Sequence, residues 1–137
     1  MKILFDFDGV FVPDFNRIPV LDGLSEFYDM LYYARPMFKP LGRWGILTGR
    51  DPLYRSVTEK YVDRHFENKP LQIFHERRMS EQKPWEYKLE VLTNNPNIMF
   101  FIESDPHTVK YLKEHLTTKC FVHLFSQLPE SLYEKGL

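Results

Sequence analysis

Short apolar runs alternate along the chain with stretches of helical character, and this alternation constrains the fold more than any other feature. The apolar runs cover residues 3–5, 44–47, 71–74, 98–102 and 120–124. Helices are predicted between them, at about residues 22–33, 51–65, 84–93 and 106–116. Acidic or proline residues mark their starts, as in Asp51-Pro52 and Asp105-Pro106. Strands that alternate with helices predict an α/β fold, with a parallel sheet of about five strands covered by helices on both faces.

The bulk composition excludes several classes of protein. A chain of 137 residues with 43% apolar residues supports one domain, over residues 1–137. A formal net charge of -1 does not imply binding to nucleic acid or to membranes by charge alone. Cys120 is the only cysteine, and the start of the chain has no signal-peptide pattern. We therefore expect a cytoplasmic protein that does not associate with membranes.

Two carboxylates, Asp6 and Asp8, directly follow the first apolar run, in the sequence FDFDGVFV. Like charges at this spacing repel, and each is costly to place beside a buried sheet. Asp and Gly are also common turn residues, so the motif alone is explained equally well by a turn. However, Thr48 follows the second run and a Glu-Ser-Asp sequence follows the fourth. Sites in α/β sheets form beyond the carboxyl ends of the strands, so these residues form one candidate site.

The order of these residues resembles the haloacid dehalogenase superfamily of phosphotransferases. The family pattern is DxD after the first strand, Thr or Ser after the second, then a Lys, then acidic residues after the fourth. These positions are DFDGV, LTGR, KPWEYK and IESDP here, so the resemblance spans residues 3–124. It implies a three-layer, Rossmann-like domain and a magnesium-dependent phosphomonoester hydrolase.

The resemblance also implies a role for each residue of the pattern. Asp6 would attack phosphorus to form an aspartyl phosphate and would give a carboxylate oxygen to Mg²⁺. Asp8 would give its backbone carbonyl to the metal, while its carboxyl group, left free, would act as the general acid and base. Thr48 would donate its hydroxyl to the phosphoryl oxygens, and a lysine would neutralise the charge that develops on them.

Two lysines compete for this role. Lys83 forms the KP pair found in many family members, whereas Lys88 matches a lysine placed one helical turn later in bacteriophage-type polynucleotide kinases. On the predicted helix, Trp85, Leu89 and Leu92 share an apolar face that Lys88 would border, so its stem could run along that face towards a polar cavity. We prefer Lys88, because Lys83 is also explained as a solvated residue at the start of a helix.

Two acidic residues after the fourth apolar run are candidates for the remaining metal ligand. Many family members carry paired acidic residues here, whereas Ser104 separates Glu103 from Asp105 in this chain. Asp105 precedes a proline and is also explained as a helix N-cap. We therefore expect Glu103 to be the better ligand, with Asp105 as the second candidate.

The TGR sequence and Lys83 are the expected substrate-binding residues, and they comprise Thr48, Gly49, Arg50 and Lys83. Arg50 is explained either as a surface arginine in a loop or as a fork of donors for a substrate phosphate. We prefer the phosphate-binding role.

The lengths of the intervals between motifs bear on the substrate. Neither residues 9–44 nor residues 49–83 are numerous enough to form a cap domain with its own core, so the resemblance is to a capless member. An open site could admit a small phosphorylated molecule or a nucleic-acid end, or a second copy of the chain could close it. The motif spacing is also similar to polynucleotide 3′-phosphatase domains, and Arg77-Arg78 could contact a nucleic-acid backbone, although a solvated loop explains this pair equally well.

A second function remains open at this point. The Glu-Ser-Asp sequence departs from the family pattern and would weaken a metal site. The alternative is therefore a binding or regulatory module that keeps the fold with little or no catalysis.

Overall fold

The computed structural model describes residues 1–12, 33–75 and 81–125. Its strands are β1 (Ile3–Phe5), β2 (Gly45–Leu47), β3 (Ile73–Phe74), β4 (Phe100–Glu103) and β5 (Phe121–Leu124). Its helices are the short 3-10 helix η2 (Pro52–Tyr54) and the α-helices α2 (Arg55–His65), α3 (Pro84–Asn94) and α4 (Pro106–His115). The predicted helix at residues 22–33 lies almost wholly outside the described residues, and so does the pair Arg77-Arg78.

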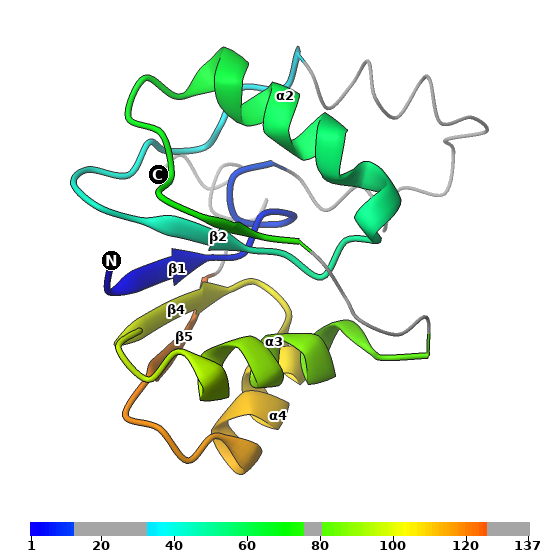
Figure 1. Cartoon of the computed structure of the whole chain (residues 1–137), viewed down its shortest axis with the longest axis vertical. Coiled ribbons are helices and arrows are strands. Elements are labelled where there is room, and N and C mark those ends of the chain that lie inside the picture. The colour runs from blue at the N-terminus through cyan, green and yellow to red at the C-terminus, as the bar shows by residue number, and fades with distance from the viewer. Residues whose placement is uncertain (13–32, 76–80, 126–137) are drawn as a thin grey trace, which may run out of the picture.

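The five strands form one parallel sheet in the order β3-β2-β1-β4-β5. Figure 1 shows α2 on one face of this sheet and α3 and α4 on the other. The helices cover opposite faces because right-handed crossovers that run in opposite directions along a sheet pack on opposite sides. The predicted α/β fold, with a parallel sheet of five strands and helices on both faces, is confirmed.

Alternating side chains divide the interior into two apolar cores. Leu4 points to the core beneath α3 and α4, whereas its neighbour Phe5 belongs to the core beneath α2. The same alternation separates Leu47 from Ile46 on β2. Because successive residues of a strand face opposite sides of a sheet, even strands as short as β1 and β2 contribute to the cores beneath both layers of helices.

The predicted ends of several elements differ from the structure by one or two residues, and the predicted helix at residues 51–65 is divided into η2 and α2. β4 begins at Phe100 rather than at residue 98, because Ile98 still belongs to a turn in which its N–H donates to the carbonyl of Asn95. The strand continues to Glu103, which pairs in register with Leu124 of β5. The prediction ended this strand one residue early because sequence hydrophobicity stops at residue 102.

A tight turn after β1 carries the backbone from the sheet into the core beneath α2. Gly9 has a φ of 81°, a left-handed backbone conformation that residues other than glycine rarely adopt. The N–H of Phe11 donates to the carbonyl of Phe7 at 3.0 Å, and both rings are fully buried. The turn therefore fixes the backbone around Asp8 by burying the aromatic residues on either side of it.

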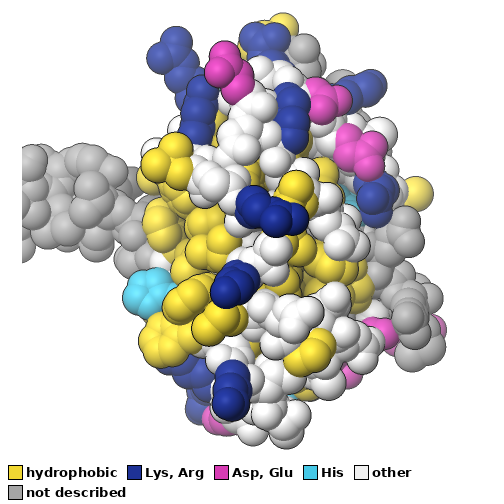
Figure 2. All heavy atoms as spheres, turned by 60° about the vertical axis from the view of Figure 1, so that its left-hand side comes forward, with side chains coloured by type: hydrophobic (Ala, Val, Ile, Leu, Met, Phe, Trp, Pro, Cys, Tyr) yellow, Lys and Arg dark blue, Asp and Glu magenta, His cyan; other side chains and the backbone are white. Residues whose placement is uncertain are grey.

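The surface at the amino ends of the strands lies away from the candidate site. Figure 2 shows this side of the molecule, where hydrophobic side chains gather near the centre and Lys and Arg are spread around them. Within the described residues, none of the helices is both long and apolar enough to cross a membrane.

Replacing Phe101 by Ala tests whether the core beneath α3 and α4 holds the fold together. Phe101 is fully buried on the central part of β4, so its loss should lower the free energy of unfolding by about 3–5 kcal/mol. Leu53→Ala is the matched control, since Leu53 is 82% exposed and its loss should cost less than about 0.5 kcal/mol. Urea unfolding measures both, and equal losses would contradict this assignment of the core.

Candidate active site

The candidate site lies at the carboxyl ends of the strands, where the order of the sheet reverses between β1 and β4. The chain passes from β1 to β2 on one side of β1, and later returns from β3 to β4 on its other side. Such a switch point leaves a crevice outside the carboxyl ends of the two strands. A pocket of about 310 Å³ opens there. Its lining comprises Asp6, Asp8, Thr48, Gly49, Arg50, Pro84, Trp85, Lys88, Glu103, Ser104, Asp105 and Thr108.

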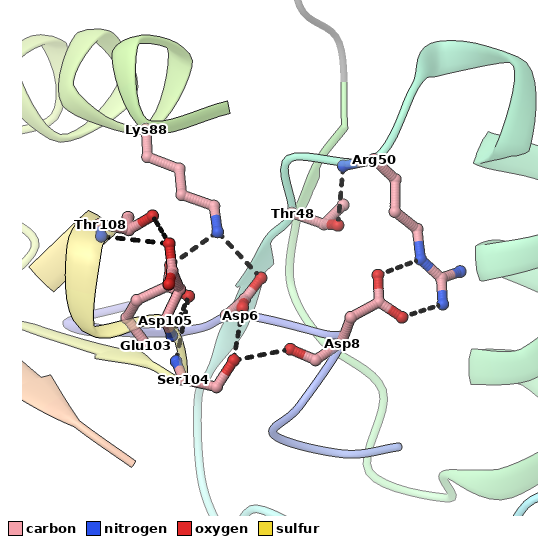
Figure 3. A network of polar contacts seen from close by, with 9 residues as sticks. All are labelled: Asp6, Asp8, Thr48, Arg50, Lys88, Glu103, Ser104, Asp105 and Thr108. Atoms are coloured by element: carbon pink, nitrogen blue, oxygen red, sulfur yellow. Dashed lines mark hydrogen bonds and ion pairs between the residues drawn. The ribbon is translucent and has the colours of Figure 1, made fainter. Parts of the chain in front are cut away.

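A buried ammonium group joins the carboxyl ends of the neighbouring strands β1 and β4 at the floor of this pocket. Nζ of Lys88 lies 3.1 Å from Oδ1 of Asp6 and 2.6 Å from Oε2 of Glu103 (Figure 3). All three side chains are buried, with 1–7% of their surface exposed. We call Asp6, Lys88 and Glu103 the lysine cluster.

The orientation of α3 differs from the sequence prediction. Its buried face consists of Tyr87, Lys88, Val91 and Leu92, whereas Trp85 and Leu89 are only half-buried. The helix is therefore rotated relative to the predicted apolar face, and Lys88 lies within its buried face rather than beside it. The ion pairs with two strand ends make this rotation favourable, because they compensate the burial of the ammonium group.

Burial and neighbouring charges shift the protonation equilibria of the lysine cluster. Burial, reinforced by the nearby Glu103, raises the pKa of Asp6 well above its usual value, although Lys88 opposes this shift. Burial alone would lower the pKa of Lys88, but attraction to Asp6 and Glu103 outweighs it and the pKa is raised. The two carboxylates therefore favour the protonated form of Lys88 at the floor of the pocket.

A second cluster forms on the side of β2. Arg50 binds the carboxylate of Asp8 with two hydrogen bonds, from Nε to Oδ2 at 2.7 Å and from Nη2 to Oδ1 at 2.6 Å. The sequence-based expectation that the Asp8 carboxyl is free is therefore wrong for this structure. Arg50 is 8% exposed, so it is also not a surface arginine. A bidentate pair of this kind is strong and geometrically specific.

Arg50 is itself held in place from two further directions. Its Nη1 donates to Oγ1 of Thr58 on α2 at 3.0 Å, and its guanidinium stacks over the ring of Phe7 at 4.4 Å. Oγ1 of Thr58 also lies 3.0 Å from Nε2 of the fully buried His75. We call Asp8, Arg50, Thr58 and His75 the arginine cluster; sequence analysis did not identify Thr58 or His75, because neither belongs to a recognisable motif.

The two acidic candidates for metal binding are engaged in other contacts. Oε2 of Glu103 binds Lys88, while its Oε1 accepts the N–H groups of Ser104 and Asp105 at 3.0 and 3.1 Å. Asp105 is the N-cap of α4, which was the alternative to a metal-binding role, and its Oδ2 accepts from both the N–H and the hydroxyl of Thr108. Although burial acts against it, these hydrogen bonds lower the pKa of Asp105.

Ser104 takes a position that sequence analysis did not assign to it. Its Oγ lies 2.9 Å from the backbone carbonyl oxygen of Asp8 and 3.4 Å from Oδ2 of Asp6 (Figure 3). The sequence pattern drew attention to this residue only as an interruption between two acids. Its hydroxyl is the contact between the lysine cluster and the backbone at Asp8.

The remaining predicted substrate-binding residues separate into two groups. Thr48 is buried in the pocket, where its Oγ1 accepts the N–H of Arg50 at 3.2 Å. Gly49 packs so closely against α3 that a Cβ atom there would lie 2.5 Å from Cβ of Pro84, so the chain needs glycine at this position. Lys83 is exposed at the start of α3 and is not part of the pocket lining.

The oxygen atoms of the pocket fit a hard cation such as Mg²⁺. Among the described residues, no group of three or more His, Cys, Asp or Glu side chains is arranged to hold a metal. A mixed set is present instead, in which the carboxylate of Asp6, the carbonyl of Asp8 and the hydroxyl of Ser104 face one another. Mg²⁺ prefers oxygen ligands and often keeps several waters, so a partial set from the protein is sufficient.

No protein-family model, curated protein or solved structure matches this chain.

Replacing His75 by Gln should remove a pH-dependent part of the stability. Burial, with Arg50 and Arg55 nearby, lowers the pKa of His75 from 6.5 to about 4, and its Nδ1 has no hydrogen-bond partner among the residues described. Between these pKa values the unfolded chain binds more protons, so the free energy of unfolding falls as the pH falls. The expected loss from this residue between pH 7 and pH 5 is about 2 kcal/mol.

The measurement is urea unfolding of the wild type and His75→Gln at both pH values. His115→Gln serves as the control because His115 is exposed. The His75 variant should lose less stability on acidification than either other protein. Three identical pH dependences would show that the pKa of His75 is the same in the folded and unfolded states, which contradicts this prediction.

The two candidate lysines are distinguished by their position in the pocket. In the phosphatase reaction that the sequence resemblance implies, Lys88→Ala should lower turnover on the order of 100-fold or more, because it removes the ammonium beside Asp6. Lys83→Ala should cost much less, because Lys83 is exposed. Steady-state kinetics on an aryl phosphate measure both, with circular dichroism to verify that each variant is folded. A larger loss in Lys83→Ala would assign the role to Lys83.

Proposed function

We propose that this protein is a magnesium-dependent phosphomonoesterase of the capless haloacid-dehalogenase-like type, acting through an aspartyl phosphate on Asp6. The observation that carries the proposal is the environment of the Asp6 carboxylate at the switch point of the sheet. One of its oxygens contacts the ammonium of Lys88, and the other faces the hydroxyl of Ser104. A nucleophile held in this way has a fixed direction of attack and a nearby positive charge.

The charge of the pocket supports a requirement for a divalent cation. Four acidic side chains line it, from Asp6, Asp8, Glu103 and Asp105, and they outnumber the two basic groups of Arg50 and Lys88. The excess negative charge of this lining would repel an incoming phosphate dianion. A bound Mg²⁺ would cancel it and would polarise the phosphoryl oxygens as a Lewis acid.

The proposed reaction proceeds in two displacements. A carboxylate oxygen of Asp6 forms a bond to phosphorus as the bond from phosphorus to the ester oxygen breaks, and Asp8 in its protonated form gives its proton to that oxygen. A water molecule then attacks the aspartyl phosphate, and Asp8 takes a proton from it. Inorganic phosphate leaves and the Asp6 carboxylate is regenerated.

The surrounding residues have distinct parts in this scheme. Lys88 and Thr48 would stabilise negative charge on the transferring group from two sides. Arg50 donates two hydrogen bonds to the carboxylate of Asp8 in this structure. Before Asp8 can transfer a proton, at least one of these hydrogen bonds must break, and Arg50 must donate to the substrate instead. A phosphoryl oxygen is a suitable replacement, since guanidinium binds phosphate as well as carboxylate.

The short intervals between motifs support a site without a cap domain, open to substrates of different sizes. The polynucleotide 3′-phosphatase resemblance makes a phosphate on a nucleotide or on a nucleic-acid end the preferred substrate class. A panel of phosphorylated sugars, nucleotides and 3′- or 5′-phosphorylated oligonucleotides tests this preference directly.

One observation favours the alternative, a binding or regulatory module with little catalysis. The bidentate contact with Arg50 occupies the carboxylate that would transfer protons, and Thr58 and Phe7 hold Arg50 in that place. Beryllofluoride, which mimics a phosphoryl group on aspartate, separates the two functions. A magnesium-dependent adduct at Asp6 supports the enzyme, and its absence at millimolar magnesium supports the binding module.

The nucleophile is tested by Asp6→Asn with a generic aryl phosphate, with and without Mg²⁺. The variant should lose essentially all turnover, because an amide cannot form the aspartyl phosphate, and the wild type should be inactive after chelation of the metal. Asp63→Asn is the matched control, since Asp63 lies on the exposed part of α2 and its side chain is 79% exposed. Activity that survives Asp6→Asn, or that needs no divalent ion, rules out this mechanism.

A further inference from the structure

Ser104 lies where two oxygens from β1 and its following turn converge. Its hydroxyl is 2.9 Å from the carbonyl oxygen of Asp8 and 3.4 Å from Oδ2 of Asp6. Ser104 lies in the turn between β4 and α4. Its backbone N–H donates to Oε1 of Glu103, the last residue of β4, at 3.0 Å, and this contact helps to hold Ser104 in place. The hydroxyl of Ser104 therefore lies beside two oxygens that come from a different segment of the chain.

The nearby carboxylates have other partners. Both oxygens of Glu103 are engaged, one with Lys88 and the other with two backbone N–H groups. Asp105 directs its carboxylate to the first turn of α4, where Thr108 binds it twice. Ser104, by contrast, places its hydroxyl beside both Oδ2 of Asp6 and the carbonyl oxygen of Asp8.

The two distances from the Ser104 hydroxyl are close to the separations between neighbouring oxygens in the ligand shell of a small hard cation. Mg²⁺ binds oxygens at about 2.1 Å in an octahedron, so neighbouring ligands lie about 3 Å apart. The two distances from Ser104 Oγ, 2.9 and 3.4 Å, are close to this spacing. In this structure the Ser104 hydroxyl donates to both oxygens, and its own oxygen is thereby placed beside the two oxygens that a shared ion would bind.

We propose that Ser104, rather than Glu103 or Asp105, supplies the third protein ligand of the divalent cation, beside the carboxylate of Asp6 and the carbonyl of Asp8. This rests on the proposed function, which requires the ion. The protein then contributes a single negative charge to the shell of the ion, and water and substrate oxygens complete it. Such a site binds Mg²⁺ weakly, because affinity rises with the number of charged ligands.

The ligand assignment predicts opposite effects of two substitutions at one position. Ser104→Asp adds a charged oxygen to the shell and should lower the dissociation constant for the ion on the order of tenfold or more. Ser104→Ala removes a ligand and should raise it on the order of tenfold. Ser56→Asp and Ser56→Ala are matched controls, because Ser56 is exposed on α2 and should leave the constant unchanged.

The readout is binding of Mn²⁺ alone, followed by electron paramagnetic resonance, which needs no substrate and no catalysis. A further variant, Ser104→Cys, identifies the ligand atom. Its thiolate should weaken Mn²⁺ binding and bind Cd²⁺, seen as ultraviolet thiolate-to-cadmium absorption that the wild type lacks. Urea unfolding of each variant verifies that the protein is folded before binding is compared.

The outcomes separate this proposal from the proposed function. Mn²⁺ binding that depends on Asp6 but is unchanged by every substitution of Ser104 overturns the ligand assignment and leaves the metal-dependent phosphatase intact. Absence of Mn²⁺ binding to the wild type at millimolar concentration overturns both, even if Ser104→Asp binds the ion. Tighter binding in Ser104→Asp together with weaker binding in Ser104→Ala supports the assignment.

Discussion

The arrangement of the candidate site depends on one buried interaction, the ammonium of Lys88 between the carboxylates of Asp6 and Glu103. Two carboxylates at the ends of adjacent strands repel one another, and burial makes each of them more costly. The ammonium offsets both effects, and because it projects from α3 it also holds that helix against the ends of β1 and β4. The pocket, the rotation of α3 and the direction of the Asp6 carboxylate all follow from this contact.

The sequence was sufficient to predict the layers of the fold because the relevant signals are local. Apolar runs of a few residues, each followed by a helix start such as Asp51-Pro52, indicate strands and helices without knowledge of their neighbours. The meeting of Asp6, Thr48 and Glu103 was also predictable, since parallel strands present their carboxyl ends at one edge of the sheet. Boundaries were less accurate, as at β4, because pairing with β1 and β5 rather than hydrophobicity decides where that strand ends.

The partners of the charged groups could not be predicted in the same way. The pattern placed Asp8 and Arg50 in one site but did not indicate that they bind each other, because that pairing results from competition among all charges in the pocket. The phase of α3 was predicted from its apolar residues, whereas the structure buries a lysine on that face. The role of Ser104 depends on a turn that brings its hydroxyl to β1, and serine carries no signal of its own at this position.

The two clusters of the site belong to different halves of the molecule. The arginine cluster rests on β2, α2 and the core beneath α2, whereas the lysine cluster rests on β1, β4 and α3 above the other core. Ser104 lies between them. Each half can therefore accumulate substitutions with little disturbance to the other, so that descendants of such a chain could change the arginine cluster on one side of the sheet while inheriting the Asp6 carboxylate on the other.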